Sequence, residues 1–122
     1  IVSGDQKRHR SNLHILARKL LREQFPYDTI LEEVPLPGSH KPSRKSTLYV
    51  DFFIPSHSLA VEVQGRQHFE FVAHFHGDRQ GFRKSKARDR DKANWLENND
   101  IQLIALSYSG KEDDWRQSII NR

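Results

Sequence analysis

The chain has 122 residues, which is enough for one hydrophobic core and too few for two domains of ordinary size. Its net charge of +4 and sequence pI near 9.6 favour a polyanionic partner such as nucleic acid, although a basic solvated surface would give the same values. The absence of cysteine excludes disulfide bonds and thiolate metal sites and is compatible with an intracellular protein.

Residues 1–10 are polar and basic and predict a flexible lead-in to a single domain at residues 11–122. They lack the apolar centre of a secretory signal, and no apolar run in the chain could cross a bilayer, so we expect no membrane partner. The chain begins with Ile1 and contains no methionine. We therefore expect the chain to be a piece of a longer protein.

The first half of the domain predicts a helix, an extended segment and a loop. Leucine and alanine at helical spacing predict a helix that starts at Ser11, its N-cap, and ends before Pro26. Residues 29–36 predict a short extended segment. Pro35 and Pro37 bar this segment from a regular central strand position. Residues 37–47 have the composition of a mobile, basic loop.

The stretch "LYVDFFIPSHSLAVEVQ" predicts a β-hairpin around a four-residue loop at residues 55–58. This loop length pairs Ile54 with Leu59 and sets Asp51 directly across from Glu62. Cross-strand partners of this kind have Cβ atoms about 4.5–5.5 Å apart. The most hydrophobic segment of the chain is therefore predicted to contain two facing carboxylates.

The second half of the domain predicts an irregular segment, two helices and a strand. Residues 65–82 are irregular and rich in glycine, histidine and aromatic residues. Residues 83–99 predict a charged helix, residues 101–106 a strand and residues 111–120 a final short helix. The order of elements predicts a single α/β domain with a central mixed sheet flanked by helices.

The facing carboxylates of Asp51 and Glu62 repel each other, and burial would raise their pKa values. A divalent cation would reverse this cost, because the pair, with the Val63 carbonyl as a third ligand, forms a hard oxygen site suited to Mg²⁺ or Mn²⁺. The alternative is that the carboxylates reach solvent or pair with Arg66 or Lys92.

The pattern of an Asp on one strand and Glu62-Val63-Gln64 on the next resembles the PD-(D/E)xK nuclease superfamily. Further elements resemble the branch of very-short-patch repair endonucleases and phage homing endonucleases of the EDxHD type. They are Gln67-His68, then Arg88-Asp89 with Lys92, then Asn99-Asp100-Ile101. The resemblance covers about residues 11–107 and implies a restriction-endonuclease-like fold and a metal-dependent endonuclease.

The resemblance implies a catalytic set of Asp51, Glu62, Gln64, His68, Asp89 and Glu33. The two carboxylates of the hairpin would hold one cation against the scissile phosphate. His68 would act as general acid or base, and Asp89 would orient it or join the outer metal shell. Glu33 competes with Glu32 and Glu23 for the place of an upstream acid. His14, beside an apolar stripe, is interpreted as structural.

Gln64 stands where the superfamily has its lysine. An amide can orient a water molecule but carries no charge, so Lys92 or His68 would have to supply the positive charge.

Basic residues gather after the hairpin, where they would neutralise phosphates in a largely sequence-independent way. The predicted nucleic-acid-binding residues are Arg66, Arg79, Arg83, Lys84, Lys86, Arg88 and Lys92. The phenylalanines interleaved with them are Phe69, Phe71, Phe75 and Phe82. These rings either cap the core or wedge between base pairs, as aromatic residues do in the repair enzymes that the chain resembles. A zinc cluster of His57, His68, His74 and His76 is disfavoured by its spacing.

Taken together, the sequence predicts a Mg²⁺- or Mn²⁺-dependent endonuclease of double-stranded DNA, in the cytoplasm of a bacterial or phage-infected cell. We expect the chain to be the catalytic fragment of a homing endonuclease, with an additional DNA-recognition domain missing from this chain. A homodimer on DNA would allow two-strand cleavage. The alternatives are a mismatch-nicking repair endonuclease, a non-catalytic nucleic-acid-binding module on the same scaffold, and an RNA-directed nuclease.

Overall fold

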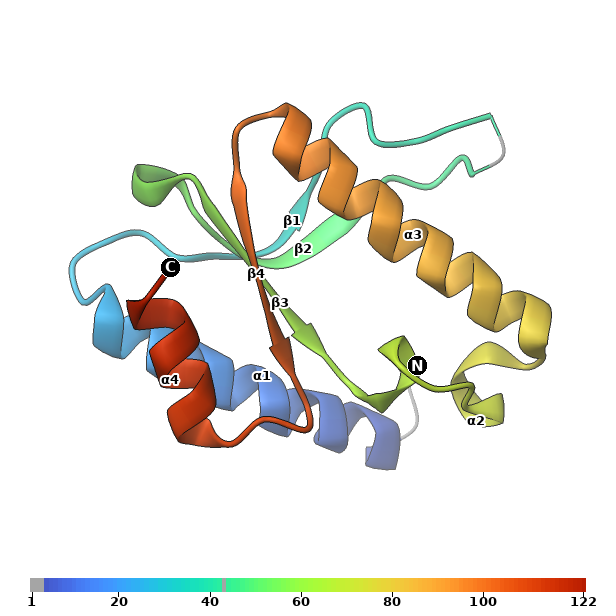
Figure 1. Ribbon diagram of the computed structural model, residues 1–122, viewed down its shortest axis with the longest axis horizontal. Helices are drawn as coiled ribbons and strands as arrows, with labels where there is room; N and C mark the ends of the chain where they lie inside the picture. The colour runs from blue at the N-terminus through green and yellow to red at the C-terminus, as the bar shows by residue number, and fades with distance from the viewer. Residues whose placement is uncertain (1–3, 43) are drawn as a thin grey trace.

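The structure is a computed structural model that describes residues 4–42 and 44–122, with side chains from residue 12 onward. Its elements, in chain order, are α1 (Gly4–Gln24), β1 (Leu31–Pro35), β2 (Tyr49–Ile54), β3 (Leu59–Gln64), α2 (Ala73–His76), α3 (Arg79–Asn98), β4 (Gln102–Ser107) and α4 (Glu112–Ile120). Two 3₁₀ turns, Pro55–His57 and Arg66–His68, follow β2 and β3. Figure 1 labels the helices and strands.

The four strands form one mixed sheet in the order β1-β2-β3-β4. β1, β2 and β3 are antiparallel neighbours, whereas β4 runs parallel to β3 and is reached through α3. A parallel neighbour requires such a crossover connection. The predicted fold class, an α/β domain with a mixed sheet flanked by helices, is confirmed.

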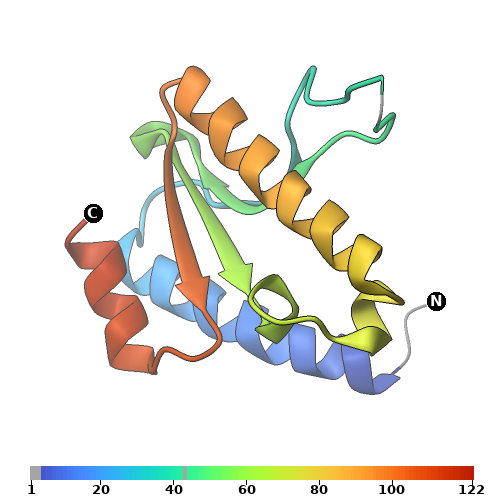
Figure 2. The ribbon, with the colours of Figure 1, turned by 45° about the vertical axis from the view of Figure 1, so that its right-hand side comes forward.

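Helices cover the sheet on two sides, with α1 and α4 on one side and α3 on the other (Figures 1 and 2). The first buried cluster joins α1 and α4 to the sheet and includes Leu21, Phe52 and Trp115. The second joins α3 to the sheet through Leu96, which packs with Val50 and Ala60. α1, α3 and α4 therefore each bury their apolar side against the sheet.

The predicted hairpin and its register are confirmed. Ile54 pairs with Leu59, and the ladder continues to Phe52 opposite Val61. Burial alternates along β2, as period-two side chains require, with Asp51 half-buried between two buried neighbours. Continued by one residue, this register sets Asp51 across from Glu62.

The first helix differs from the sequence prediction because α1 starts at Gly4 instead of Ser11. Most of residues 4–10 that were expected in a flexible lead-in belong to types with good helix propensity, and they extend the helix without a break. Residues 1–3 lie outside the described residues.

The third helix also starts earlier than predicted, at Arg79, because Asp78 caps it. The Asp78 carboxylate accepts a hydrogen bond from the Gly81 amide at 2.8 Å. No helix in the described part of the chain is long and apolar enough to span a membrane.

The basic loop after β1, predicted to be mobile, is attached to α3 where it is described. Asp91 accepts hydrogen bonds from Lys41 Nζ at 2.8 Å and from Arg44 Nη1 at 2.6 Å. The Trp95 indole donates to the Pro37 carbonyl at 3.0 Å. The loop thus lies beside the same helix that carries Lys92.

Candidate active site

A wide cleft of about 1140 Å³ opens between α1 and α3, and the strands β1, β2 and β3 contribute to its lining. The predicted site residues that line it are Glu33, Asp51, Glu62, Val63, His68, Arg88, Asp89 and Lys92. They come from both halves of the chain, and the sheet and α3 bring them together.

Asp51 lies where β2 and β3 separate. The residue ladder between these strands ends at Phe52 and Val61, one position before the acidic pair. Beyond it, the Asp51 carboxylate accepts a hydrogen bond from the Val63 amide at 2.7 Å. The amide of Val63 therefore fixes the Asp51 carboxylate. The carbonyl of Val63 as a cation ligand stays a prediction.

Glu62 is buried, with 6% of its surface exposed, beside the negative charge of Asp51. Burial first, and then the Asp51 charge, raise the pKa of the Glu62 carboxyl to about 8, although Lys92 acts in the opposite direction. The two carboxyl groups thus interact closely, as the register predicted.

Lys92 reaches Glu62 from α3. Its Nζ lies 2.6 Å from Oε1 of Glu62, and both side chains are largely buried. Oε1 receives no well-oriented hydrogen bond despite this short distance, so the contact is best described as an ion pair. The alternative in which Glu62 pairs with Lys92 is therefore what the structure shows.

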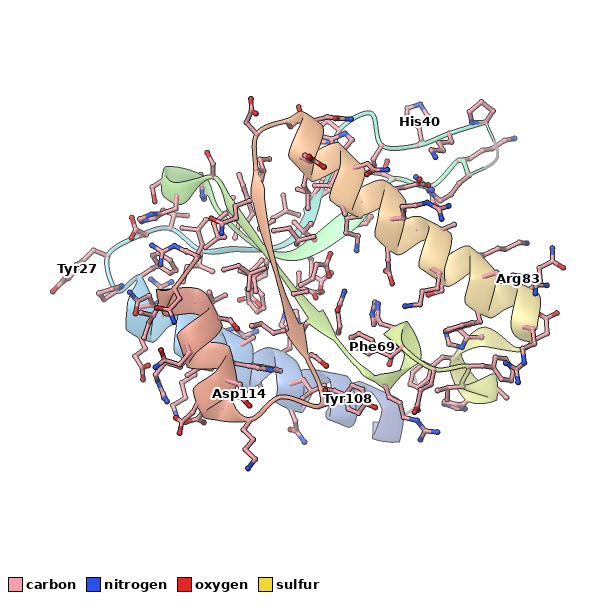
Figure 3. The ribbon with its side chains drawn as sticks, viewed as in Figure 1. Tyr27, His40, Phe69, Arg83, Tyr108 and Asp114 are labelled. Carbon is pink, nitrogen blue, oxygen red and sulfur yellow. The ribbon has the colours of Figure 1, made fainter. Side chains whose placement is uncertain are left out.

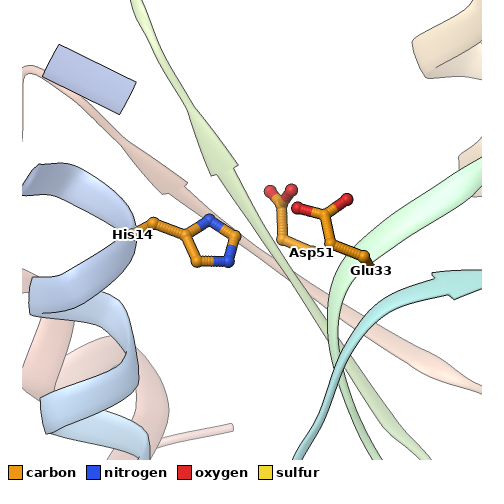
Figure 4. A group of neighbouring side chains, drawn as sticks. All are labelled: His14, Glu33 and Asp51. Carbon is orange, nitrogen blue, oxygen red and sulfur yellow. The ribbon is translucent and has the colours of Figure 1, made fainter. Parts of the chain in front are cut away.

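Glu33 and His14 join Asp51 in a second grouping (Figure 4). One ligand atom from each of these three residues lies within 4.8 Å of the others, so the group could hold a metal ion. Glu33 is the upstream acid that the resemblance implied. His14, interpreted from sequence as structural, lies beside it and also packs against the Phe52 ring.

The backbone of β1 explains why two successive glutamates line the cleft. Successive side chains of a regular strand point to opposite faces, yet Glu32 and Glu33 both border the cleft. Glu33 has a φ of +52°, a left-handed conformation that is rare for residues other than glycine. Such a conformation is found more often at functional sites than elsewhere.

Glu32, the competitor of Glu33, instead fixes a cation of α1. Its two carboxylate oxygens accept hydrogen bonds from Arg18 Nε and Nη2, both at 2.8 Å. These hydrogen bonds lower the pKa of the Glu32 carboxyl. Glu23 lies elsewhere, on α1 against Arg116 of α4.

His68 and Asp89 meet as expected. Nδ1 of His68 lies 3.0 Å from Oδ2 of Asp89, and both side chains are mostly buried at the cleft. The 3₁₀ turn after β3 carries the histidine, and α3 carries the carboxylate. Asp89 therefore orients the His68 ring.

Gln64, predicted as a site residue, is not among the described residues that line the cleft. It ends β3 beside β4, where its carbonyl accepts a hydrogen bond from the Tyr108 amide at 2.8 Å. Gln67 lines the cleft instead and was missed as a site residue. Lys92 is the group that brings positive charge to the acidic pair.

Apart from Lys92, which pairs with Glu62, the predicted nucleic-acid-binding residues fall into two sets. Arg66, Arg79 and Lys86 are engaged within the chain, by Glu70 or by the rings of nearby phenylalanines. Arg83, Lys84 and Arg88 are exposed on α3, and Arg83 extends away from the helix in Figure 3.

Two of the phenylalanines that were expected to cap the core or wedge into DNA are exposed. Phe69 and Phe75 have 46% and 40% of their surface accessible. Phe69 lies against Tyr108, with ring centroids 6.0 Å apart (Figure 3), and Phe75 borders the cleft. Neither ring belongs to the two buried clusters.

The histidines considered for a zinc cluster lie apart. His57 is in the hairpin turn, 3.3 Å from an Asp28 oxygen and against the Phe25 ring. His68 is at the opposite end of β3. The Nδ1 atom of His76 accepts a hydrogen bond from the Val72 amide at 3.0 Å.

No protein-family model and no solved structure matches the chain. The chain is 35% identical over 65 residues to uncharacterized protein 307L of Invertebrate iridescent virus 6. The aligned segment covers 53% of this chain and 33% of that protein. The chain is also 37% identical over 82 residues to uncharacterized protein 094L of Frog virus 3. This aligned segment covers 66% of this chain and 53% of that protein.

A third similarity, to uncharacterized protein 033L of Invertebrate iridescent virus 3, is 30% identity over 118 residues. It covers 93% of this chain and 57% of that protein. The chain thus spans between a third and three-fifths of the length of these three curated relatives. It is similar to uncharacterized proteins of three viruses.

Proposed function

We propose that the chain is a divalent-metal-dependent endonuclease that hydrolyses phosphodiester bonds of double-stranded DNA. One observation carries the proposal: Asp51, Glu33 and His14 converge in the same cleft as the buried pair of Glu62 and Lys92. The side chains fit a divalent cation, since carboxylate oxygens and an imidazole nitrogen are ordinary ligands of such ions.

Asp51 would be the central ligand, because its carboxylate is already fixed by the Val63 amide and belongs to both acidic groupings. Glu33 would bind the same cation. Glu62, assigned from sequence as a direct ligand, would hold Lys92 in the site and, in its ionised form, add negative charge next to Asp51. A divalent cation bound there supplies Lewis acidity and offsets the negative charge of the phosphate.

Lys92 would do the work of the lysine that is missing at position 64. It enters the site from α3 instead of from β3, and its Nζ already lies beside the acidic pair. A lysine ammonium in this place can contact a phosphate oxygen and stabilise the charge that develops during hydrolysis.

His68 would be the general acid or base. Asp89 engages Nδ1 of the ring and leaves Nε2 to exchange a proton with water or the leaving oxygen. The carboxylate also fixes the ring orientation. Exposed Arg83, Lys84 and Arg88 on α3 would track DNA phosphates, and the exposed Phe69 and Phe75 rings would contact bases.

On the resemblance of its motifs, we propose the catalytic domain of a homing endonuclease, with a mismatch-nicking repair endonuclease as the alternative within the same class. A non-catalytic DNA-binding module is the candidate from another class. It is favoured by one observation: Lys92 already neutralises Glu62, so the folded protein does not need a cation at that carboxylate.

The test is incubation of the purified chain with supercoiled plasmid in Mg²⁺ or in EDTA. We expect nicking only with the metal, and loss of nicking in Asp51→Asn and in Glu62→Gln. Asp28→Asn is the matched control, since Asp28 lies with Ser56 and His57 by the hairpin turn. Full cleavage by Asp51→Asn would refute the proposed function, and metal-independent DNA binding without cleavage would favour the non-catalytic module.

A further inference from the structure

We infer that His14 is a direct nitrogen ligand of the cation held by Glu33 and Asp51, and that the site therefore selects transition-metal ions such as Mn²⁺ over Mg²⁺ and Ca²⁺. The inference rests on the proposed function only in sharing its metal-binding cleft. It names the ion that the cleft prefers and the residue that sets the preference.

The three ligands come from three different elements. His14 is on α1, Glu33 on β1 and Asp51 on β2, and one ligand atom of each lies within 4.8 Å of the other two. Among the described residues, this is the one group of three or more His, Asp or Glu side chains that is close enough to hold a metal ion. Figure 4 shows the imidazole and the two carboxylates side by side.

The surroundings of His14 match those of a metal-ligating histidine. Such a histidine usually directs its second ring nitrogen to a carboxylate, which fixes the ring and makes the first nitrogen more basic. Nε2 of His14 lies 3.4 Å from Oε1 of Glu32. The histidine therefore has an outer carboxylate in place, and Nδ1 is the atom that we assign to the metal.

That outer carboxylate is itself held. Arg18 donates two hydrogen bonds to Glu32, both at 2.8 Å. On the ring face, Phe52 packs against the imidazole with centroids 4.5 Å apart. A chain of contacts from Arg18 through Glu32 to His14 thus orients a nitrogen toward Asp51 and Glu33.

The ligand set decides the selectivity. Mg²⁺ and Ca²⁺ favour oxygen ligands, whereas an imidazole nitrogen shifts preference toward first-row transition metals. Two carboxylates with one imidazole should therefore bind Mn²⁺ more tightly than Mg²⁺. Replacing His14 by Gln should remove most of this difference, because the amide offers oxygen or a weak donor in place of the imidazole nitrogen.

The experiment measures Mn²⁺ binding to the DNA-free chain by pulsed electron paramagnetic resonance, which detects a ¹⁴N nucleus bonded to the ion. We expect a nitrogen coupling in the wild type, its loss in His14→Gln, and its persistence in His68→Gln, the same change at another cleft histidine. Titration should show at least about tenfold weaker Mn²⁺ binding in His14→Gln. Mg²⁺ binding should change less.

A second measurement avoids any folding defect of the variant, since His14 packs on Phe52. In the wild type labelled with ¹⁵N-histidine, substoichiometric Mn²⁺ should broaden the ring signals of His14 before those of the other histidines. First broadening of His68, a nitrogen coupling that survives in His14→Gln, or no nitrogen coupling in the wild type would each overturn the inference.

These outcomes are separate from those of the proposed function. A chain that binds Mn²⁺ through His14 but leaves plasmid intact would support this inference and refute the nuclease proposal. A chain that cleaves plasmid in Mg²⁺ but shows no nitrogen coupling to Mn²⁺ would do the reverse.

Discussion

Glu62 combines a buried carboxyl group, an acidic neighbour and a basic partner within one site. Burial and Asp51 favour the protonated form, while Lys92 favours the ionised form, and the balance raises the pKa to about 8. Perturbed carboxyl groups of this kind occur at catalytic sites and in structural ion pairs alike. The protonation state of Glu62 is therefore expected to be coupled to metal binding at Asp51.

The raised pKa predicts how stability depends on pH. The folded state holds the Glu62 proton more tightly than the unfolded state, whose carboxyl has a pKa near 4.5. The resulting stabilisation is complete below pH 4.5 and is lost as the pH rises through about 8. We expect the free energy of unfolding in EDTA to fall over this window, as measured by urea denaturation at a series of pH values.

Two variants separate the causes of this fall. Glu62→Gln should flatten it, and Asp51→Asn should move it to lower pH because one negative charge is removed beside Glu62. Identical pH profiles for the wild type and Glu62→Gln would show that the carboxyl does not titrate as described.

The left-handed backbone at Glu33 predicts a difference in stability between two small substitutions at this position. Glu33→Ala and Glu33→Gly both remove the carboxylate and its contacts, but only glycine adopts a φ of +52° without cost. We expect the glycine variant to be about 1 kcal/mol more stable than the alanine variant by thermal denaturation. The same pair at Glu32 should show the opposite order, and an alanine advantage at Glu33 would argue against the left-handed conformation.

For individual residues, the sequence predicted the contacts that follow from strand register or from position on a helix. Asp51 faces Glu62 because a four-residue loop sets the register, and Asp89 reaches His68 from the next helix. The role of His14 could not be predicted, because it depends on how α1 lies across the sheet and on the left-handed backbone at Glu33. Neither feature has a signature in local sequence.

Among the elements, α3 contributes most of the side chains on one wall of the cleft. Lys92 and Asp89 face the site, while Asp91 holds the loop after β1 through Lys41 and Arg44. These hydrogen bonds lower the pKa of the Asp91 carboxyl. The helix therefore links the position of the basic loop to that of Lys92.

Asp91→Asn should release the basic loop. It removes an ionised partner from the mostly buried Arg44 guanidinium, so we expect a loss of about 1–3 kcal/mol in stability. Hydrogen exchange should rise in residues 37–42 and 44–47. Glu97→Gln, an exposed change on the same helix, should leave both unchanged, and equal exchange in the two variants would contradict this account of the loop.

The ends of elements were harder to predict than their existence. The hydrophobic alternation of β2 and β3 was sufficient to place them, whereas α3 begins at Arg79 because of a cap at Asp78 that the charged sequence conceals. Gln64 was assigned to the site because the resemblance places it where the superfamily has its lysine. It is not among the described residues that line the cleft, although Val63 and Gly65 on either side of it are.

At the scale of the whole molecule, the chain has a net charge of +4, and α3 carries several of its exposed cations. The exposed cations of α3 border or flank the cleft that contains Asp51, so a bound duplex would place its phosphates near the acidic group. The predicted fold class followed from the order of elements, because parallel β3 and β4 need a helical crossover. The helix packing that forms the cleft did not follow from that order.

A substitution of Arg88, which lines the cleft, tests whether DNA binds beside α3. In an Asp51→Asn background, which keeps DNA intact, Arg88→Gln should lower the magnitude of the salt dependence of DNA binding by about one, in units of log K against log salt. Lys19→Gln is the control, since Lys19 lies toward Glu112 of α4. Equal slopes for both variants would place the DNA elsewhere.

Hydrolysis itself is tested most directly by cleaving plasmid in oxygen-18 water with Mg²⁺ and measuring the mass of the terminal phosphates of the products by mass spectrometry. If groups around Asp51 direct water onto a phosphodiester, each cut made by the wild type incorporates one heavy oxygen into a terminal phosphate, and Asp51→Asn yields no labelled ends. Unlabelled ends, or labelled ends at the same rate from Asp51→Asn, would contradict the assignment of this cleft as the hydrolytic site.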